Sequence, residues 1–218
     1  MSCWFQVGGP GQPSCLKGAV RGGYGAKAAG RLSVFKMASS LVPILKTTRL
    51  ILRPQEDADA QALFAILSDA RAMHFWNRAA ISRLAVVEDL LREQQAAMTD
   101  GLCCYWTVIQ GSDAIGSIDL SLIQDGSAEL GFLLRPDHWG LGLASEAVGA
   151  VAAHGLNDLG LTRLAAAVQA QNRAAARVLE KNGFARVESR PVRLADGQSK
   201  ACDFYLRARG CGSPNAQT

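Results

Sequence analysis

Two glycines stand between a predicted strand and a predicted helix, in the segment Arg135-Pro-Asp-His-Trp-Gly-Leu-Gly-Leu-Ala-Ser-Glu-Ala147. Gly140 and Gly142 carry no Cβ, so the backbone N–H groups around them can approach a ligand closely. The start of the following helix adds unpaired N–H donors and a partial positive charge. The segment therefore predicts a cradle for a phosphate or a pyrophosphate.

Particular residues exclude two familiar phosphate-binding loops. A P-loop needs a Lys followed by Ser or Thr, and the segment contains no Lys. The dinucleotide fingerprint needs Gly or Ala where Ser145 stands, and an acidic residue at the end of the next strand, where Gln169 and Asn172 stand instead. For the glycines taken alone, a tight turn without a ligand remains the alternative interpretation.

Strand and helix patterns alternate along the chain around this loop. A strand is predicted over 48–53, ended by Pro54, and then a helix capped by Asp57 that carries Leu63 and Leu67 on its apolar face. The other predicted elements are a helix over 83–99, strands near 103–109, 114–122 and 128–134, a helix over 140–158, a strand over 162–168, a helix from Asn172 to Asn182, and strands near 184–190 and 201–208. Short turns make the middle strands an antiparallel meander, and the strand–helix–strand step adds a parallel pair. The predicted class is α+β, a mixed, mostly antiparallel sheet flanked by helices.

Four segments, in order, resemble conserved motifs of one enzyme family. They are Thr47-Thr-Arg-Leu-Ile-Leu-Arg-Pro54, Ala128-Glu-Leu-Gly-Phe132, Trp139-Gly-Leu-Gly-Leu-Ala-Ser-Glu-Ala147, and Asn172-Arg-Ala-Ala-Ala-Arg-Val-Leu-Glu-Lys-Asn-Gly-Phe184. Over about residues 45–208 the chain resembles the GCN5-related N-acetyltransferases (GNAT), most of all the RimJ/RimL-like branch of ribosomal-protein alanine acetyltransferases. The resemblance implies the acyl-CoA N-acyltransferase fold, whose sheet splays open after the Glu129 strand and holds CoA in the gap.

The resemblance also implies acetyl-CoA as cosubstrate, with no metal. The backbone amides from Gly140 to Ser145 would hold the pyrophosphate, Phe132 and Leu134 would pair with the pantetheine arm, and Asn172 would contact the thiol end. The full predicted donor-binding set is Phe132, Leu133, Leu134, Trp139, Gly140, Leu141, Gly142, Leu143, Ala144, Ser145, Asn172 and Arg177. Trp139 replaces the usual Gln or Arg and packs either on the cofactor or in the core. Arg173, Arg177 and Lys181 share a helix face that meets either the 3′-phosphate or solvent.

An amine is protonated at neutral pH and must lose a proton before it attacks a thioester, and a nearby carboxylate can accept that proton. The resemblance places Glu129 beside the acetyl group as the predicted base; a solvated strand residue is the alternative. A backbone N–H near Leu133 is predicted to stabilise the oxyanion. Leu179 stands where many members carry Tyr, so Ser145 is the predicted proton donor to the thiolate, with helix capping, phosphate binding or unaided thiolate departure as alternatives.

The acceptor would be bordered by the segment between the first two helices, where His74, Phe75 and Trp76 are the predicted substrate-binding residues. Their alternative role is to pack the helices on the sheet. The formal net charge of +4 divides into +8 over residues 1–55, −10 over 56–162 and +6 over 163–218. The acidic middle block suits a cationic amine. The sequence does not distinguish a peptide N-terminus from a small-molecule amine, and a homodimer is compatible with it.

Composition bounds the remaining possibilities. Apolar residues make up 49% of the 218 residues, which excludes a wholly disordered chain, and no apolar run reaches the roughly 18 residues of a membrane helix. The six cysteines show no metal-ligand spacing and are predicted to be reduced, in a cytoplasmic protein. Three segments are predicted: a disordered basic, glycine-rich extension over 1–40, the catalytic domain over 41–209 and a flexible tail over 210–218.

The predicted function is transfer of an acetyl group from acetyl-CoA to a primary amine. The alternative from another class is a catalytically degenerate CoA-binding module that acts as a sensor or interaction protein, because the family tyrosine is missing. Nucleic-acid binding would rest only on the basic N-terminal block and is not expected.

Overall fold

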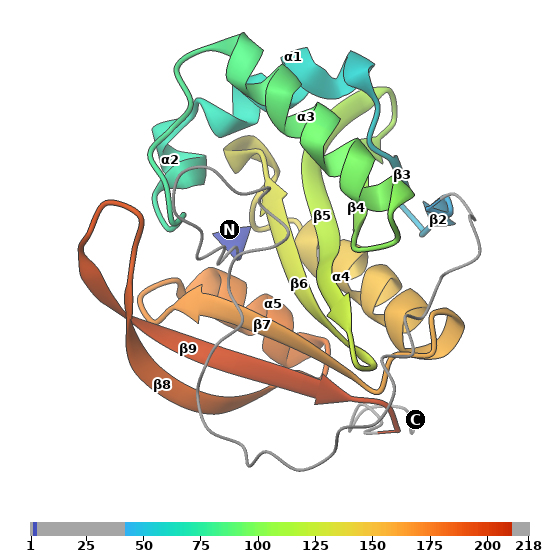
Figure 1. Ribbon diagram of the computed structural model, residues 1–218, viewed down its shortest axis with the longest axis vertical. Coiled ribbons are helices and arrows are strands. Elements are labelled where there is room, and N and C mark those ends of the chain that lie inside the picture. The colour runs from blue at the N-terminus through green and yellow to red at the C-terminus, as the bar shows by residue number, and fades with distance from the viewer. Residues whose placement is uncertain (1, 4–41, 211–218) are drawn as a thin grey trace.

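The computed structural model describes residues 2–3 and 42–210, and within this part eight strands form a mixed sheet in the order β2-β3-β4-β5-β6-β7-β9-β8 (Figure 1). The strands are β2 (Leu45–Lys46), β3 (Ile51–Pro54), β4 (Cys104–Gln110), β5 (Asp113–Gln124), β6 (Ser127–Leu134), β7 (Arg163–Gln169), β8 (Ala185–Arg193) and β9 (Ser199–Ala208). A two-residue strand β1 (Ser2–Cys3) pairs with β6 from outside this path. Apart from these two residues and Gly210, the predicted extension over 1–40 and tail over 210–218 lie outside the described residues.

Helices cover both faces of the sheet (Figure 1). The helices are α1 (Ala60–Leu67), α2 (Ala70–Met73), α3 (Leu84–Thr99), α4 (Leu143–Ala153) and α5 (Arg173–Lys181), with short 3₁₀ turns η1 (Asp57–Asp59) and η2 (Pro136–His138) and a π-helical turn η3 (His154–Asp158). Alternation along β6 separates the faces: Leu130 and Phe132 join the core under α4 and α5, whereas Leu133 joins the cluster of α1–α3. No helix in the described part of the chain is long and apolar enough to cross a membrane.

The strand pairing confirms the predicted mixed α+β sheet. β4, β5 and β6 form the antiparallel meander, and β6 and β7 form the parallel step around α4. The apolar side of the central helix α4 is buried as well, including Leu143, Ala147 and Val148. Asn172 caps α5 by accepting from the N–H of Ala175, and Gly183 follows that helix with a φ of 75°.

Three local predictions differ from the structure. The strand over 48–53 is a hairpin of β2 and β3, because Thr47 and Leu50 hydrogen-bond across a turn. The helix over 140–158 begins only at Leu143, since Gly142 has a φ of 79°, and it widens into η3 at its end. Glu56, not Asp57, is the N-cap of the first helical turn. The four-residue helix α2 was not predicted at all.

The carboxylate of Asp59 fixes this first turn to the sheet. It lies 2.6 Å from Nη2 of Arg53 and accepts from the hydroxyl of Thr107 at 2.6 Å. Burial alone would raise the pKa of Asp59, but the hydrogen bonds from Arg53, Thr107 and the Glu56 backbone outweigh it and lower that pKa. Asp59 thereby holds the start of α1 against β3 and β4.

Candidate active site

The two parallel strands β6 and β7 separate in the middle of the sheet. Their pairing runs only from Ser127 to Glu129 on β6, opposite Arg163 to Ala165 on β7. Beyond Glu129, β6 continues to Leu134. Of the eight strands in the order given above, only β5 pairs with this part of β6. One edge of β6 is therefore released from β7 over five residues, as the family resemblance implies.

Backbone direction along this edge alternates. The carbonyl of Leu133 faces β5, since a Cβ built on Gly116 would lie 2.3 Å from it, and the N–H of Arg135 donates to Ile115 on the same side. The carbonyls and amides of Phe132 and Leu134 therefore face the released edge. β1 lies along this edge, with Cys3 opposite Phe132. A donor arm that paired with Phe132 and Leu134 would take the place of β1.

The glycine loop follows the released edge and leads into α4. Gly140 and Gly142 have φ values of 78° and 79°, in the left-handed region that favours glycine. A Cβ built on Gly140 has no heavy atom within 4 Å, and Leu141 is 55% exposed. The first amides of α4 lack intrahelical acceptors, so this open loop presents N–H donors together with the positive end of a helix. Its residues fit a pyrophosphate.

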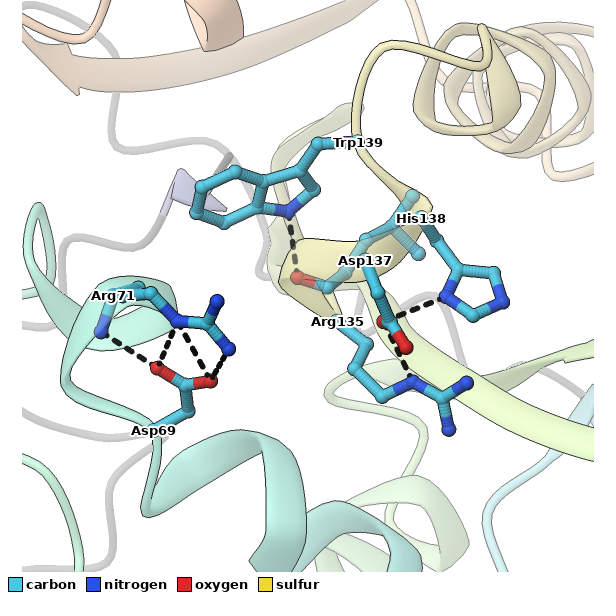
Figure 2. Close-up of polar contacts among 7 residues, drawn as sticks. Asp69, Arg71, Arg135, Asp137, His138 and Trp139 are labelled. Atoms are coloured by element: carbon cyan, nitrogen blue, oxygen red, sulfur yellow. Dashed lines mark hydrogen bonds and ion pairs between the residues drawn. The ribbon is translucent and has the colours of Figure 1, made fainter.

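Trp139 does not extend into solvent. Its indole N–H donates to the carbonyl of Leu134 at 2.8 Å, and the ring packs against the core under α4 (Figure 2). Before it, the carboxylate of Asp137 accepts from Nε of Arg135 and contacts Nδ1 of His138, both at 2.8 Å. These two partners lower the pKa of Asp137 to about 2. The approach to the glycine loop is thus fixed by local hydrogen bonds.

Glu129 occupies the last position at which β6 pairs with β7. Its neighbours Ala128 and Leu130 face the core under α4, so its side chain lies on the other face of the sheet. No hydrogen bond or ion pair holds its carboxylate within the described residues, and burial raises its pKa to about 7. A carboxyl group with such a pKa can accept and release a proton near neutral pH.

Ser145 and Asn172 lie at the starts of α4 and α5. The side-chain amide of Asn182 donates to the hydroxyl and the carbonyl of Ser145, both at 3.1 Å, which joins the end of α5 to the first turn of α4. Asn172 is 2% exposed, and its side-chain oxygen caps α5. Arg177 lies on the exposed part of α5, whereas Leu179 is fully buried in the core.

The predicted acceptor residues follow α2 on the same face as Glu129. The carbonyl of Phe75 accepts from the side-chain amide of Gln169, at the end of β7, at 3.1 Å. His74 is exposed and meets the ring of Phe75 edge to face, with 4.6 Å between centroids. Trp76 is 8% exposed and packs among α1, α2 and α3. The segment is therefore held across the opening between β6 and β7.

Arg49 was missed as a functional residue by the sequence analysis. Its guanidinium reaches the glycine loop and donates to the carbonyl of Leu141 at 2.8 Å. The sequence predicted Arg49 to lie within the strand over 48–53. That strand is three strands away from β6, which leads into the loop, so no contact between Arg49 and the loop was expected. Only the turn between β2 and β3 brings it there.

Comparison with known proteins decides the family. The family model described as "Acetyltransferase (GNAT) domain" matches residues 49–185. The chain belongs to the GNAT acetyltransferase family. A GNAT relative, the uncharacterized N-acetyltransferase YoaA of Bacillus subtilis (strain 168), is 31% identical over 148 residues, which cover 66% of this chain and 84% of the relative. The predicted fold, family and enzyme class are confirmed, and the comparisons lend no support to the degenerate binding module.

Solved structures share the fold at low sequence identity. The ribosomal L7/L12 alpha-N-protein acetyltransferase RimL, in complex with coenzyme A, superposes with a TM-score of 0.69 at 17% identity, over 78% of this chain and 100% of that one. Spermidine N-acetyltransferase from Vibrio cholerae, in complex with CoA and spermine, gives a TM-score of 0.67 at 19% identity, over 75% of this chain and 97% of that one. One of these GNAT proteins is named for a protein acceptor and the other for a polyamine.

Among the residues that the structure describes, no three His, Cys, Asp or Glu side chains cluster in a way that could hold a metal ion.

Proposed function

We propose that this GNAT acetyltransferase transfers the acetyl group of acetyl-CoA directly to a primary amine, with Glu129 as the general base. The observation that carries the proposal is the position of Glu129. It is a half-buried carboxylate at the point where β6 leaves β7, at the inner end of the released edge that leads to the glycine loop. A donor seated on the loop and along that edge would extend toward Glu129.

The donor site uses mainly backbone groups. Amides from Gly140 to Ser145 hold the pyrophosphate, and the groups of Phe132 and Leu134 that face away from β5 pair with the pantetheine arm. Bound acetyl-CoA supplies the thioester, whose carbonyl carbon is the electrophile. Relatives of known structure were solved with CoA, which supports this choice of donor.

Proton transfer at the acceptor is assigned to Glu129. The ionised carboxylate accepts a proton from the acceptor's ammonium group, directly or through water, and the free nitrogen lone pair then forms the C–N bond. An amide N–H of the released edge beside Leu133 donates to the oxygen that gains negative charge. With a pKa of about 7, Glu129 is ionised in a large fraction of the molecules at neutral pH and is still basic enough to accept the proton.

When the C–S bond breaks, its electron pair remains on the sulfur of CoA. Ser145, the predicted proton donor, lies at the pyrophosphate end of this arrangement and its hydroxyl accepts from Asn182, which favours its alternative roles in helix capping or phosphate binding. Leu179, at the position of the family tyrosine, has no proton to donate and lies in the core. A thiol pKa of about 8.5 also makes the thiolate a fair leaving group without help.

For the acceptor we propose a cationic primary amine, either a protein N-terminus or a small molecule, bounded by His74 and Phe75 with Trp76 behind them. The buried cysteines Cys104 and Cys202 are free thiols, which suits a reducing cytoplasm.

An acceptor screen tests the function. The protein is mixed with acetyl-CoA and a panel of peptides with free N-termini, polyamines and amino sugars, and released thiol is measured. We expect at least one amine class to raise thiol release well above the rate of hydrolysis, with a matching acetylated product by mass spectrometry. CoA binding without any amine-dependent thiol release would refute the proposal.

A further inference from the structure

The turn between β2 and β3 lies against the first turn of α4, which is almost 100 residues further along the chain. The hydroxyl of Thr47 donates to Oε1 of Glu146 at 2.5 Å, and the backbone N–H of Arg49 donates to the same oxygen at 2.8 Å. Glu146 stands one turn into α4 and its side chain is 16% exposed. One carboxylate thus connects the edge of the sheet to the helix that follows the glycine loop.

The guanidinium of Arg49 makes two further contacts at this junction. Its Nε donates to Oε2 of Glu146 at 2.7 Å, and its Nη1 donates to the carbonyl of Leu141 at 2.8 Å. Its Nη2 lies 3.5 Å from the position that a Cβ would take on Gly142. Arg49 therefore contacts both the loop itself and the helix that follows it.

The contact with Leu141 fixes the direction of a peptide group. A trans peptide is planar, so its C=O and the following N–H point to opposite sides. Because Arg49 holds the carbonyl of Leu141, the N–H of Gly142 points away from Arg49. A glycine with a φ near 79° is otherwise free to turn this peptide over, since glycine adopts φ values of either sign at little cost.

The contact of Arg49 with Glu146 places a positive charge beside a negative one. A carboxylate in the first turn of α4 lies close to the helix end that would receive a pyrophosphate, and it would repel that anion. Burial alone would raise the pKa of Glu146, but the hydrogen bonds from Thr47 and Arg49 outweigh it and keep the pKa below its ordinary value, so the carboxylate is charged at neutral pH. The guanidinium of Arg49, at 2.7 Å, compensates this charge.

We infer that Arg49 is a positioning residue for the donor, which orients the Leu141–Gly142 peptide and compensates Glu146 so that the glycine loop can bind the pyrophosphate. The inference rests on the proposed acetyl-CoA donor. Arg49 lies at the edge of the sheet, far from the reacting atoms, and should affect only the affinity for the pyrophosphate part of the donor.

The test compares two donors that differ in the pyrophosphate. Arg49→Met is expected to raise the Kd of CoA, measured by calorimetry, roughly 10- to 100-fold, the range expected for a lost hydrogen bond between charged groups. With acetyl-CoA its KM should rise while kcat changes less than about twofold. With S-acetylpantetheine, which lacks the pyrophosphate, kcat/KM should stay within about twofold of the unchanged protein. A merely structural role would reduce the use of both donors equally.

Arg92→Met is the matched control, because Arg92 is an exposed arginine of α3 that also pairs with a carboxylate, that of Asp89. It should leave the Kd of CoA unchanged. Arg49→Lys keeps the charge but cannot contact Glu146 and Leu141 together, and it should weaken CoA binding several-fold; this variant decides the question if Arg49→Met does not fold.

Two outcomes would overturn the inference in distinguishable ways. Arg49 has no such role if the unchanged protein binds CoA and a folded Arg49 variant binds it equally well. The same holds if the variant's kcat/KM falls as much with S-acetylpantetheine as with acetyl-CoA. If the unchanged protein does not bind CoA at all, the proposed donor itself is wrong and the role of Arg49 falls with it.

Discussion

The two faces of the sheet contribute to the site in different ways. On the face of α4 and α5, the proposed donor site consists of backbone groups in one contiguous segment, from Phe132 through the glycines to Ser145. On the opposite face, Glu129, Phe75 and Gln169 come from three separate segments, and Phe75 and Gln169 contact each other only in the folded chain. Recognition by backbone can be encoded in a short motif, whereas recognition by side chains depends on how distant elements pack. The proposed acceptor face therefore cannot be located from one short motif.

Replacing Glu129 should have the largest effect and should separate the two faces most clearly. We expect Glu129→Gln to lower kcat by about 10²- to 10⁴-fold, the contribution of a positioned general base, while the Kd of CoA stays unchanged. The measurement is steady-state turnover together with calorimetry of CoA. Unchanged turnover would show that another group accepts the proton.

The pH dependence gives an independent check on Glu129. Burial raises its pKa to about 7, and only the ionised carboxylate is a base. The kcat/KM of the unchanged protein should therefore fall as the pH drops below about 7 and level off above it. Residual activity of Glu129→Gln should lack this limb; a limb that persists in the variant would assign it to a different group.

The acceptor segment allows packing to be separated from binding. Trp76 is 8% exposed among α1–α3, so Trp76→Ala should lower the free energy of unfolding by about 3 kcal/mol or more. Phe75 is only half-buried, and Phe75→Ala should raise the KM of the acceptor about tenfold without changing that of acetyl-CoA. Chemical denaturation and two-substrate kinetics measure these effects. Equal KM changes for both substrates in Phe75→Ala would contradict an acceptor role.

The glycine loop offers a matched pair of substitutions. Gly140 and Gly197 have φ values of 78° and 81°, and neither has a heavy atom within 4 Å of a built Cβ. Alanine at either position should cost about 1 kcal/mol of stability through the left-handed backbone. Only Gly140→Ala should also raise the KM of acetyl-CoA, about fivefold, because only there would the strain shift amides that bind the donor. Equal donor KM values in both variants would exclude Gly140 from the donor site.

The antiparallel meander of β4, β5 and β6 and the parallel step to β7 followed from local patterns, and they were predicted correctly. The short turns between the middle strands and the strand–helix–strand succession depend only on neighbours in the chain. The hairpin at Thr47 was not predicted: hydrogen bonds between Thr47 and Leu50 close its turn, and Glu146, almost 100 residues further along the chain, also contacts that turn. The π-helical end of the central helix was not predicted either, because the spacing of apolar residues does not distinguish a widened helical turn from a regular one.

Within the candidate site, too, features set by neighbouring residues could be predicted, whereas features set by distant contacts could not. The glycine loop could be identified because its requirement, a backbone free to adopt positive φ, is visible as residue type. The pKa of Glu129 could not be predicted, because it depends on burial by elements distant in sequence. Arg49 was missed because its long side chain crosses from one edge of the sheet to the loop, a distance that strand periodicity does not encode.

The smallest predicted effect concerns Trp139, which precedes the glycine loop and packs against the core under α4. Its indole N–H donates to the carbonyl of Leu134 on the released edge of β6. We therefore expect the ring to affect donor binding only by holding that carbonyl in place. Trp139→Phe should lower stability by about 1 kcal/mol, the contribution of one hydrogen bond, and change the KM of acetyl-CoA less than about threefold. Thermal unfolding and donor kinetics measure both values. A tenfold rise in that KM with normal stability would instead mean that the indole contacts the donor directly, and that donor recognition here is not a matter of backbone alone.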